Sequence, residues 1–238
     1  MKLLFSRKEY KYKIPMHLFS SLMERVSEMM EPDPYNGDQK SYNVRSLYFD
    51  SLARDFYFQK IDGYPYRRKV RLRTYSDIPD KEPVFLEVKN KYVDWIFKQR
   101  THLKSYKKMI ESGYHFNMLS ADDDLVEQCV YLQKIYGLRP SILVSYQRAA
   151  FLDSKYDFKI SFDWDIKSSE SRDFWLPNDQ LTPVLRGYFI LELKFNQMVP
   201  EFFPDLVREF DLQRMTYSKY TCSIDAALAP KGIILGGF

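Results

Sequence analysis

The sequence is poor in glycine, cysteine and histidine. Its 238 residues include only 8 glycines, 2 cysteines and 3 histidines. No G-x-G-x-x-G, G-x-x-x-x-G-K-[ST] or G-x-S-x-G pattern occurs, which excludes the usual glycine-rich phosphate loops and the nucleophile elbow of serine hydrolases. The isolated histidines argue against a histidine-rich zinc site. Whatever chemistry the chain performs must therefore rest on other side chains.

Long apolar runs are also missing. None approaches the roughly 18–20 residues of a membrane-spanning helix, and Arg7, Lys8 and Glu9 come too early for the apolar core of a secretory signal. Cys129 and Cys222 have no spacing typical of a metal site or a disulfide framework, and reduced thiols are usual in the cytoplasm. We expect a cytoplasmic protein with no membrane segment in this chain.

The residues that are present indicate a folded, strand-rich protein. Hydrophobic residues make up 45% of the chain and aromatic residues 17%, which rules out global disorder. The formal net charge of +4 is too small to imply general binding of nucleic acid. No linker or low-complexity tract interrupts the sequence, so we expect residues 1–238 to form a single domain.

Hydrophobic periodicity predicts strands and helices in alternating blocks. The expected strands are residues 3–14, 42–49, 66–75, 83–91, 95–103, 141–152, 158–164 and 184–195, and the expected helices are residues 15–30, 104–112, 122–136, 200–210 and 218–228. Asp122, Asp123 and Asp124 are typical of a helix N-cap and first turn rather than a metal cluster. The order predicts an α+β fold with an antiparallel sheet of seven to nine strands, enough to close a barrel.

Charged residues repeat on one face of most strands. Glu-x-Lys steps occur at residues 9–11, 87–89 and 192–194, and side chains two residues apart share a face. Other residues of this charged set are Arg45, Lys69, Arg71, Arg73, Lys98, Arg100, Tyr146, Arg148 and Lys159. Such a face either points to solvent or lines a basic, water-filled lumen if helices cover the apolar face. The pattern alone does not decide between these two arrangements.

Eight short motifs follow one another along the chain. They are Arg7-x-Glu9-x-Lys11-Tyr12, Ser46-Leu47-Tyr48-Phe49-Asp50-Ser51, Arg71-x-Arg73, Glu87-Val88-Lys89, Lys98-Gln99-Arg100, Tyr146-Gln147-Arg148-x-Ala150-Phe151, Leu191-Glu192-Leu193-Lys194 and Ser218-Lys219-Tyr220. In this order they resemble the VTC polyphosphate polymerase domain, a branch of the triphosphate tunnel metalloenzymes in the CYTH-like superfamily, over about residues 5–225.

The resemblance implies an antiparallel eight-stranded β-barrel tunnel with a basic lumen and helices packed outside. Leu72, Val88 and Leu193 would then face outward under the helices. The implied catalytic residues are Lys11, Arg71, Arg73, Arg148, Lys194 and Lys219. The implied phosphate-binding residues are Lys89, Lys98, Tyr146, Lys159 and Ser218. Glu192 is the implied ligand of Mn²⁺ or Mg²⁺, and Glu9 and Glu87 are further metal candidates.

The implied function is metal-dependent transfer of the γ-phosphate of ATP to a polyphosphate chain. Two alternatives stay open: a triphosphatase that uses the same site, and a module that binds polyphosphate without turnover. Two departures from the family pattern bear on this choice. Lys159 stands where the family often has Arg, and Thr216 stands where polymerases commonly have Lys, with Arg214 as a nearby substitute. Nucleic acid is not expected as a partner, because three glutamates share the basic face and the aromatics lie mostly on the other face.

Overall fold

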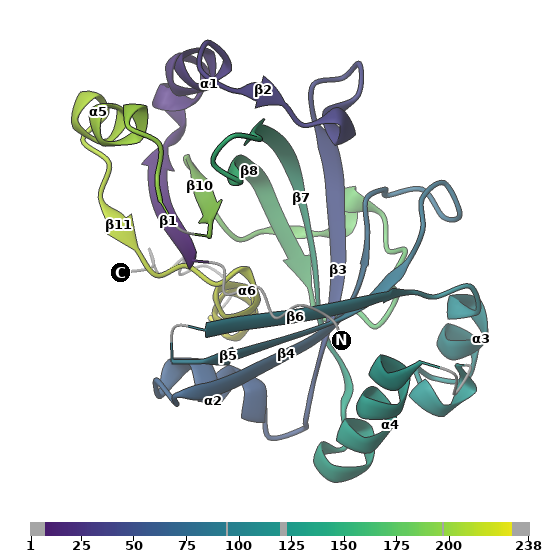
Figure 1. Ribbon diagram of the computed structural model, residues 1–238. Coiled ribbons are helices and arrows are strands. Elements are labelled where there is room, and N and C mark those ends of the chain that lie inside the picture. Colours follow the sequence, from purple (N-terminus) through teal and green to yellow (C-terminus); the bar gives the residue numbers. More distant parts are fainter. Residues whose placement is uncertain (1–7, 94, 120–122, 197, 230–238) are drawn as a thin grey trace.

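The computed structural model describes residues 8–93, 95–119, 123–196 and 198–229 (Figure 1). The longer strands are β1 (Lys8–Pro15), β3 (Tyr42–Asp50), β4 (Tyr66–Thr74), β5 (Phe85–Tyr92), β6 (Trp95–His102), β7 (Arg139–Asp153), β8 (Phe158–Ser169) and β10 (Tyr188–Phe195). Two-residue strands are β2 (Glu31–Pro32), β9 (Thr182–Pro183) and β11 (Arg214–Met215). The α-helices are α1 (Phe19–Ser27), α2 (Asp55–Ile61), α3 (Tyr106–Glu111), α4 (Asp124–Tyr136), α5 (Phe202–Glu209) and α6 (Lys219–Leu228). Short 3₁₀ helices are η1 (Met16–Leu18), η2 (Pro34–Asn36), η3 (Phe116–Met118) and η4 (Asn178–Gln180).

All strands belong to one antiparallel sheet in the order β11-β1-β10-β8-β7-β3-β4-β5-β6, with β2 paired to β7 and β9 to β8. The expected α+β class with an antiparallel sheet is confirmed. The expected closed barrel of eight strands is wrong, because the sheet has 11 strands and, among the described residues, no backbone pairing joins its two ends. Strand β11 covers only Lys11 and Tyr12 of β1. Charged side chains occupy the space between β1 and β5 instead of a backbone ladder.

The sheet curls into a trough. Figure 1 shows β4, β5 and β6 crossing the direction of β1, β10, β8 and β7. The pairing register shifts at Tyr48/Phe49 between β3 and β7 and at Ser145/Gln147 between β7 and β8. Such bulges bend strands and increase their twist. They lie in the middle of the sheet, where they bring its two halves to face each other.

The apolar face of the sheet is the outer one. Leu72 and Val88 are buried in a cluster with Met109 of α3 and with residues of α4. Leu193 is buried in a second cluster with Leu22 of α1 and with residues of α5. The expected outward orientation of these three sheet residues is confirmed. Since neighbouring residues in a strand point to opposite faces, the charged set, except Arg45, lines the concave side.

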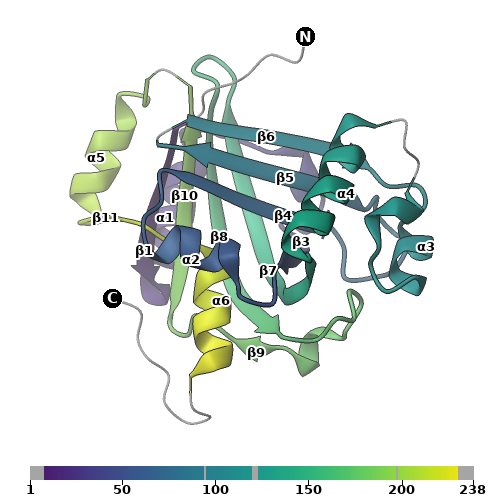
Figure 2. The ribbon, with the colours of Figure 1, turned by 90° about the horizontal axis from the view of Figure 1, so that it is seen from below.

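Helix α6 lies at one end of the trough, against its concave face (Figure 2). Its Tyr220 and Ile224 pack with Tyr48, Tyr146 and Ile190 in a third buried cluster. The helix begins where the sequence predicts, because the Ser218 hydroxyl accepts a hydrogen bond from Thr221 N at 3.3 Å as an N-cap. This cap holds the Ser-Lys-Tyr motif against the inside of the sheet.

The helix after the acidic run is confirmed from Asp124 onward. The Asp123 carboxylate accepts a hydrogen bond from Leu125 N at 2.8 Å, which is the capping role expected of this segment. Gly137 follows the helix with a φ of 61°, the left-handed conformation in which a side chain is strained. Asp122 lies outside the described residues. In the part of the chain that is described, no helix has the length and apolar character needed to cross a bilayer.

Candidate functional site

Three buried carboxylates organise the cations of the concave face. The first is Glu87 on β5, which is 1% exposed. The Arg71 Nη2 atom lies 2.6 Å from its Oε2 atom, and the Lys98 Nζ atom lies 2.5 Å from its Oε1 atom. Arg73 is further away, at 3.9 Å. Burial raises the pKa of Glu87, but these three cations more than reverse the effect and hold the pKa well below its usual range.

Glu192 on β10 is the second carboxylate. Its oxygens lie 3.0 Å from Lys194 Nζ and 3.7 Å from Lys11 Nζ, and Arg148 Nη2 is 4.0 Å away. Lys11 stands opposite Glu192 in the β1–β10 pairing. Burial raises the pKa of Glu192, whereas Lys194 and Lys11 lower it further than burial raises it. The carboxylate is therefore ionised on the same face as the cations.

Asp163 on β8 is the third carboxylate, and the sequence analysis did not assign it to the site. It is fully buried and binds the Arg148 guanidinium through two bonds, with Nε 2.5 Å from Oδ1 and Nη2 2.7 Å from Oδ2. Lys219 Nζ on α6 lies 2.5 Å from Oδ2. The alternation Lys159-x-Ser161-x-Asp163 already carried the signal, because it places Asp163 on the charged face. Asp163 fixes the orientation of two cations from different elements.

Hydroxyl groups complete the concave lining. The Arg71 Nη1 atom donates to the Tyr48 hydroxyl at 2.9 Å, and Arg73 Nε donates to Ser46 Oγ at 3.0 Å. Arg73 Nη2 also donates to the Tyr146 hydroxyl at 3.4 Å. Ser46 and Tyr48 were quoted only as part of a motif, yet their alternation on β3 places both side chains toward the cations. The two guanidinium groups are thus held by fixed partners on both sides.

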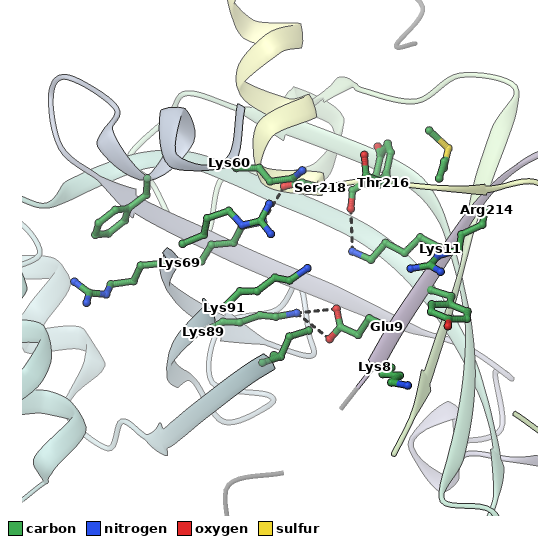
Figure 3. Close-up of a pocket in the computed structure, with 17 residues that line it drawn as sticks. Lys8, Glu9, Lys11, Lys60, Lys69, Lys89, Lys91, Arg214, Thr216 and Ser218 are labelled. Atoms are coloured by element: carbon green, nitrogen blue, oxygen red, sulfur yellow. Dashed lines mark hydrogen bonds and ion pairs between the residues drawn. The ribbon is translucent and has the colours of Figure 1, made fainter. Parts of the chain in front are cut away.

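A cavity of about 650 Å³ opens between β1, β4, β5, α2 and residues 214–218 (Figure 3). Nine of the 17 described residues that line it are Lys or Arg, and among these 17 only Glu9 is acidic. Lys89 Nζ donates to both Glu9 oxygens at 2.7 and 2.8 Å, and Lys69 Nζ donates to Ser218 Oγ at 2.8 Å. The first pair of bonds joins β5 to β1 across the cavity, and the Lys69 bond joins β4 to the residue that caps α6.

The cavity carries more positive charge than its carboxylate can neutralise. Burial lowers the pKa of Lys69 strongly, and the neighbouring Lys11 and Lys89 lower it further. Burial also lowers the pKa of Lys98 to about 7, although Glu87 opposes the shift. The pKa of Glu9 falls to about 2, because Lys89 outweighs the burial that would raise it. A bound anion would relieve the mutual repulsion of these lysines.

The remaining sequence candidates lie at the margins. Lys159 is bound to Asp33 at a short distance, on the same face as Asp163 and near Arg148 and Lys194. Thr216 and Arg214 both line the large cavity, where the Arg214 guanidinium lies 3.7 Å from the centre of the Tyr10 ring. Arg45 is the exception: its guanidinium donates outward to the carbonyl oxygens of residues 174 and 176, because odd-numbered β3 residues point away from Ser46 and Tyr48. Its assignment to the charged face is wrong.

The carboxylates of the concave face suit a divalent cation that is also bound to phosphate. They suit a metal site formed by protein side chains alone less well. Within the described ranges, no group of three or more His, Cys, Asp or Glu side chains is arranged to hold a metal. Glu192 lies close enough to Glu9 to raise the pKa of Glu9. Mg²⁺ commonly binds through one or two carboxylates, several waters and substrate phosphates. The pair Glu9 and Glu192 fits this requirement.

Together these features define a protein with a curled antiparallel sheet, helices on its outer face and a basic, trough-shaped concave face. The family model for the VTC domain matches residues 6–228. The chain therefore belongs to the VTC domain family, and the resemblance found in its motifs is confirmed.

Solved structures with a TM-score of 0.50 or more share the fold at low sequence identity. A putative adenylate cyclase from Bacillus halodurans is 13% identical, with a TM-score of 0.55 over 90% of this chain and 95% of that one. A chain of the Schizosaccharomyces pombe Mediator head module is 11% identical, with a TM-score of 0.50 over 88% of this chain and 100% of that one. The PH1819 protein from Pyrococcus horikoshii is 15% identical, with a TM-score of 0.49 over 92% and 99% of the two chains. No match was found among the curated proteins.

Proposed function

We propose that residues 1–238 act as one domain that binds triphosphate and polyphosphate in its basic trough and transfers the γ-phosphate of ATP to a polyphosphate chain. The observation that carries this proposal is the convergence of Arg71, Arg148 and Lys219 from three elements on one desolvated face. Around them, Lys69 in the adjoining cavity and Lys98 beside Glu87 have depressed pKa values. A polyanion is the class of ligand whose negative charge would neutralise such a face.

The arrangement suits phosphoryl transfer because this reaction asks mainly for positioning and for stabilisation of charge. Arg71 and Arg73 offer planar donor groups that match phosphate oxygens, and Lys11, Lys194 and Lys219 act as point charges. In the proposed step, a terminal oxygen of the polyphosphate forms a bond to the γ-phosphorus of ATP. The bond from that phosphorus to the β–γ bridging oxygen breaks, and ADP leaves with the bonding electrons.

A phosphate acceptor fits the site better than water does. A terminal phosphate oxygen is already ionised and needs no base, whereas water must lose a proton. Asp163, Glu87 and Glu192 have lowered pKa values, which makes them weak bases near neutral pH. The pKa of Lys98, about 7, is better suited to a base that works near neutral pH, but a bound polyanion raises this pKa. We therefore favour chain growth over hydrolysis.

A divalent cation would be held by Glu192, with Glu9 beside it. When bound, Mn²⁺ or Mg²⁺ supplies further neutralisation of charge on the phosphates. Side chains of the protein still orient the phosphates. Arg148 and Lys219 are fixed by Asp163, and Arg71 is fixed by Glu87 and Tyr48.

The test is to incubate the purified protein with ATP and Mn²⁺ and to stain a gel for polyphosphate while free phosphate is measured in parallel. Chains that lengthen with time support the proposal. Release of phosphate without chains indicates the triphosphatase, which the presence of Thr216 in place of a lysine would explain. If neither product forms with Mn²⁺ or Mg²⁺ although tripolyphosphate binds, the protein is a binding module.

A further inference from the structure

Two cations of the concave face stand directly opposite each other on neighbouring strands. Lys159 of β8 pairs with Lys194 of β10 in the sheet register. Side chains at such positions lie on the same face, and like charges there repel each other. Lys194 has Glu192 as a partner, at 3.0 Å. Burial lowers the pKa of Lys159, and Lys194 and Arg148 lower it further. Lys159 therefore needs a negative partner of its own.

Asp33 supplies this partner from outside the long strands. It lies between β2 and η2 and is only 5% exposed. Its Oδ2 atom accepts a hydrogen bond from Lys159 Nζ, and its Oδ1 atom accepts one from Tyr35 N at 3.0 Å, which caps η2. One carboxylate oxygen thus serves the local backbone, and the other serves a lysine of the trough.

The segment that carries Asp33 is fixed to β7. Asp33 N donates to the carbonyl oxygen of Ala150 at 2.8 Å. The side chain of Asn36 donates to the same oxygen at 2.8 Å and accepts from Ala150 N at 3.0 Å. The pairing of β3 with β7 extends only as far as Arg148, so residues 33–36 occupy the edge that β3 leaves free. The fold itself, and not the ion pair alone, therefore holds the Asp33 carboxylate beside Lys159.

Asp33 differs from the three carboxylates that organise the trough. Those residues lie on long strands, and each contacts at least two cations: Glu87, Glu192 and Asp163. Among the residues that the structure describes, Asp33 forms an ion pair with Lys159 alone. Its carboxylate thus neutralises one cation and does not orient a group of them. The Lys159 side chain is 26% exposed, which leaves it accessible to an anion in the trough.

We propose that Asp33 competes with phosphate for Lys159 and so weakens the hold of the trough on a bound polyanion. The inference rests on the proposed function, since it takes the polyanion to lie along the concave face. Carboxylate and phosphate oxygens are both anionic acceptors, and one ammonium group carries a single positive charge. A phosphate at Lys159 therefore either displaces Asp33 or stays beside a like charge. The chain is consequently held less tightly at Lys159 than in the large cavity, where lysines and arginines outnumber Glu9.

The test measures the affinity for long-chain linear polyphosphate by isothermal titration calorimetry, with EDTA present. Asp33→Asn keeps the size of the side chain and an acceptor for Tyr35 N but removes the charge. It should bind polyphosphate at least about fivefold more tightly than the wild type. In a Lys159→Gln background the same substitution should change the affinity by less than about twofold, because the contested cation is gone. A purely structural role for Asp33 would weaken binding or leave it unchanged.

Asp205→Asn is the matched control, because Asp205 is exposed on α5 and pairs with Arg208 there. It removes the same charge and should leave the affinity unchanged. Asp33→Ser keeps an N-cap acceptor on a side chain too short to reach Lys159, and it replaces Asp33→Asn if that variant does not fold.

Three results would overturn the competition while leaving the phosphate trough intact. They are no gain in affinity for the Asp33 variants, an equal gain with and without Lys159, and an equal gain for Asp205→Asn. A wild type that does not bind polyphosphate would overturn the proposed function and this inference together.

Discussion

Lys89 of β5 donates to both carboxylate oxygens of Glu9 on β1, at 2.7 and 2.8 Å, across the gap that separates the two ends of the sheet (Figure 3). No backbone pairing joins these two strands among the residues described. The side-chain pair therefore connects β1 and β5 in place of backbone hydrogen bonds. It also places Glu9, the one acidic residue among the described residues that line the large cavity, against one of the cavity's lysines.

Glu9→Gln should destabilise the protein and strengthen its response to phosphate. Loss of the carboxylate leaves Lys89 partly buried without its charge partner, which costs roughly 1–3 kcal/mol of unfolding free energy. The remaining positive charge should increase the thermal stabilisation by tripolyphosphate in EDTA above that of the wild type. Glu28→Gln, which removes an exposed pair with Arg25, is the control and should change little. A weaker response of Glu9→Gln to tripolyphosphate would contradict this account of the gap.

Asp163→Asn should lower turnover more than it lowers substrate affinity. The change leaves Arg148 and Lys219 buried without their shared carboxylate, so we expect a loss of about 3–5 kcal/mol in stability. The two cations would still attract phosphate but would no longer be fixed in orientation. Steady-state kinetics with ATP should show kcat reduced at least about tenfold, with KM unchanged or lower. A rise in KM at constant kcat would argue against a positioning role.

Tripolyphosphate affinity should rise as the pH falls from about 8.5 to 6.5. The pKa of Lys98 is about 7 in the free protein, so Lys98 is mostly neutral above that pH and protonated below it. An anion favours the protonated form, and its binding must therefore draw protons from the buffer. Titration calorimetry in two buffers of different ionisation enthalpy measures this uptake. Lys98→Gln should reduce it near pH 8; unchanged uptake would mean that another group titrates.

Glu192→Gln should remove the dependence of turnover on Mn²⁺ or Mg²⁺ together with most of the turnover itself. The substitution keeps the size of the side chain but removes the charge that a hard cation requires. Binding of tripolyphosphate without metal should persist or increase, because Lys11 and Lys194 lose their partner. If Glu192 only balances these lysines, stability and activity will fall together while the metal requirement of the residual activity stays unchanged.

The sequence was most informative where alternation is regular. The charged sides of β4, β5 and β10 and the helix that starts after Ser218 were predictable from spacing, whereas the outward direction of Leu72 and Val88 followed only from the family resemblance. Parity alone did not reveal which side was concave; the bulges at Tyr48/Phe49 and Ser145/Gln147, which bend the sheet, depend on tertiary pairing. The same limit explains the error at Arg45, whose charge suggested the wrong face.

Two other features needed the three-dimensional arrangement. Closure of the barrel could not be judged from strand number, because β11 ends after two residues and charged side chains separate β1 from β5. The rings of Tyr35, Tyr42 and Tyr75 contact one another from three separate segments, and nothing in their spacing brings them together. Asp163, by contrast, was predictable from the sequence, because its position on β8 already placed it among the cations.

The central claim, that the concave face is a phosphate-binding trough, is tested most directly by the melting temperature in saturating tripolyphosphate. A ligand that binds only the folded state stabilises it by RT ln(1+[L]/Kd), about 2.7 kcal/mol at a hundredfold excess over Kd. We predict a clear rise in Tm for the wild type and for Lys134→Ala, an exposed lysine on α4. Arg71→Ala should lose most of that rise, because it removes a guanidinium held between Glu87 and Tyr48. An unchanged Tm for the wild type, or an equal rise in all three proteins, would contradict the claim.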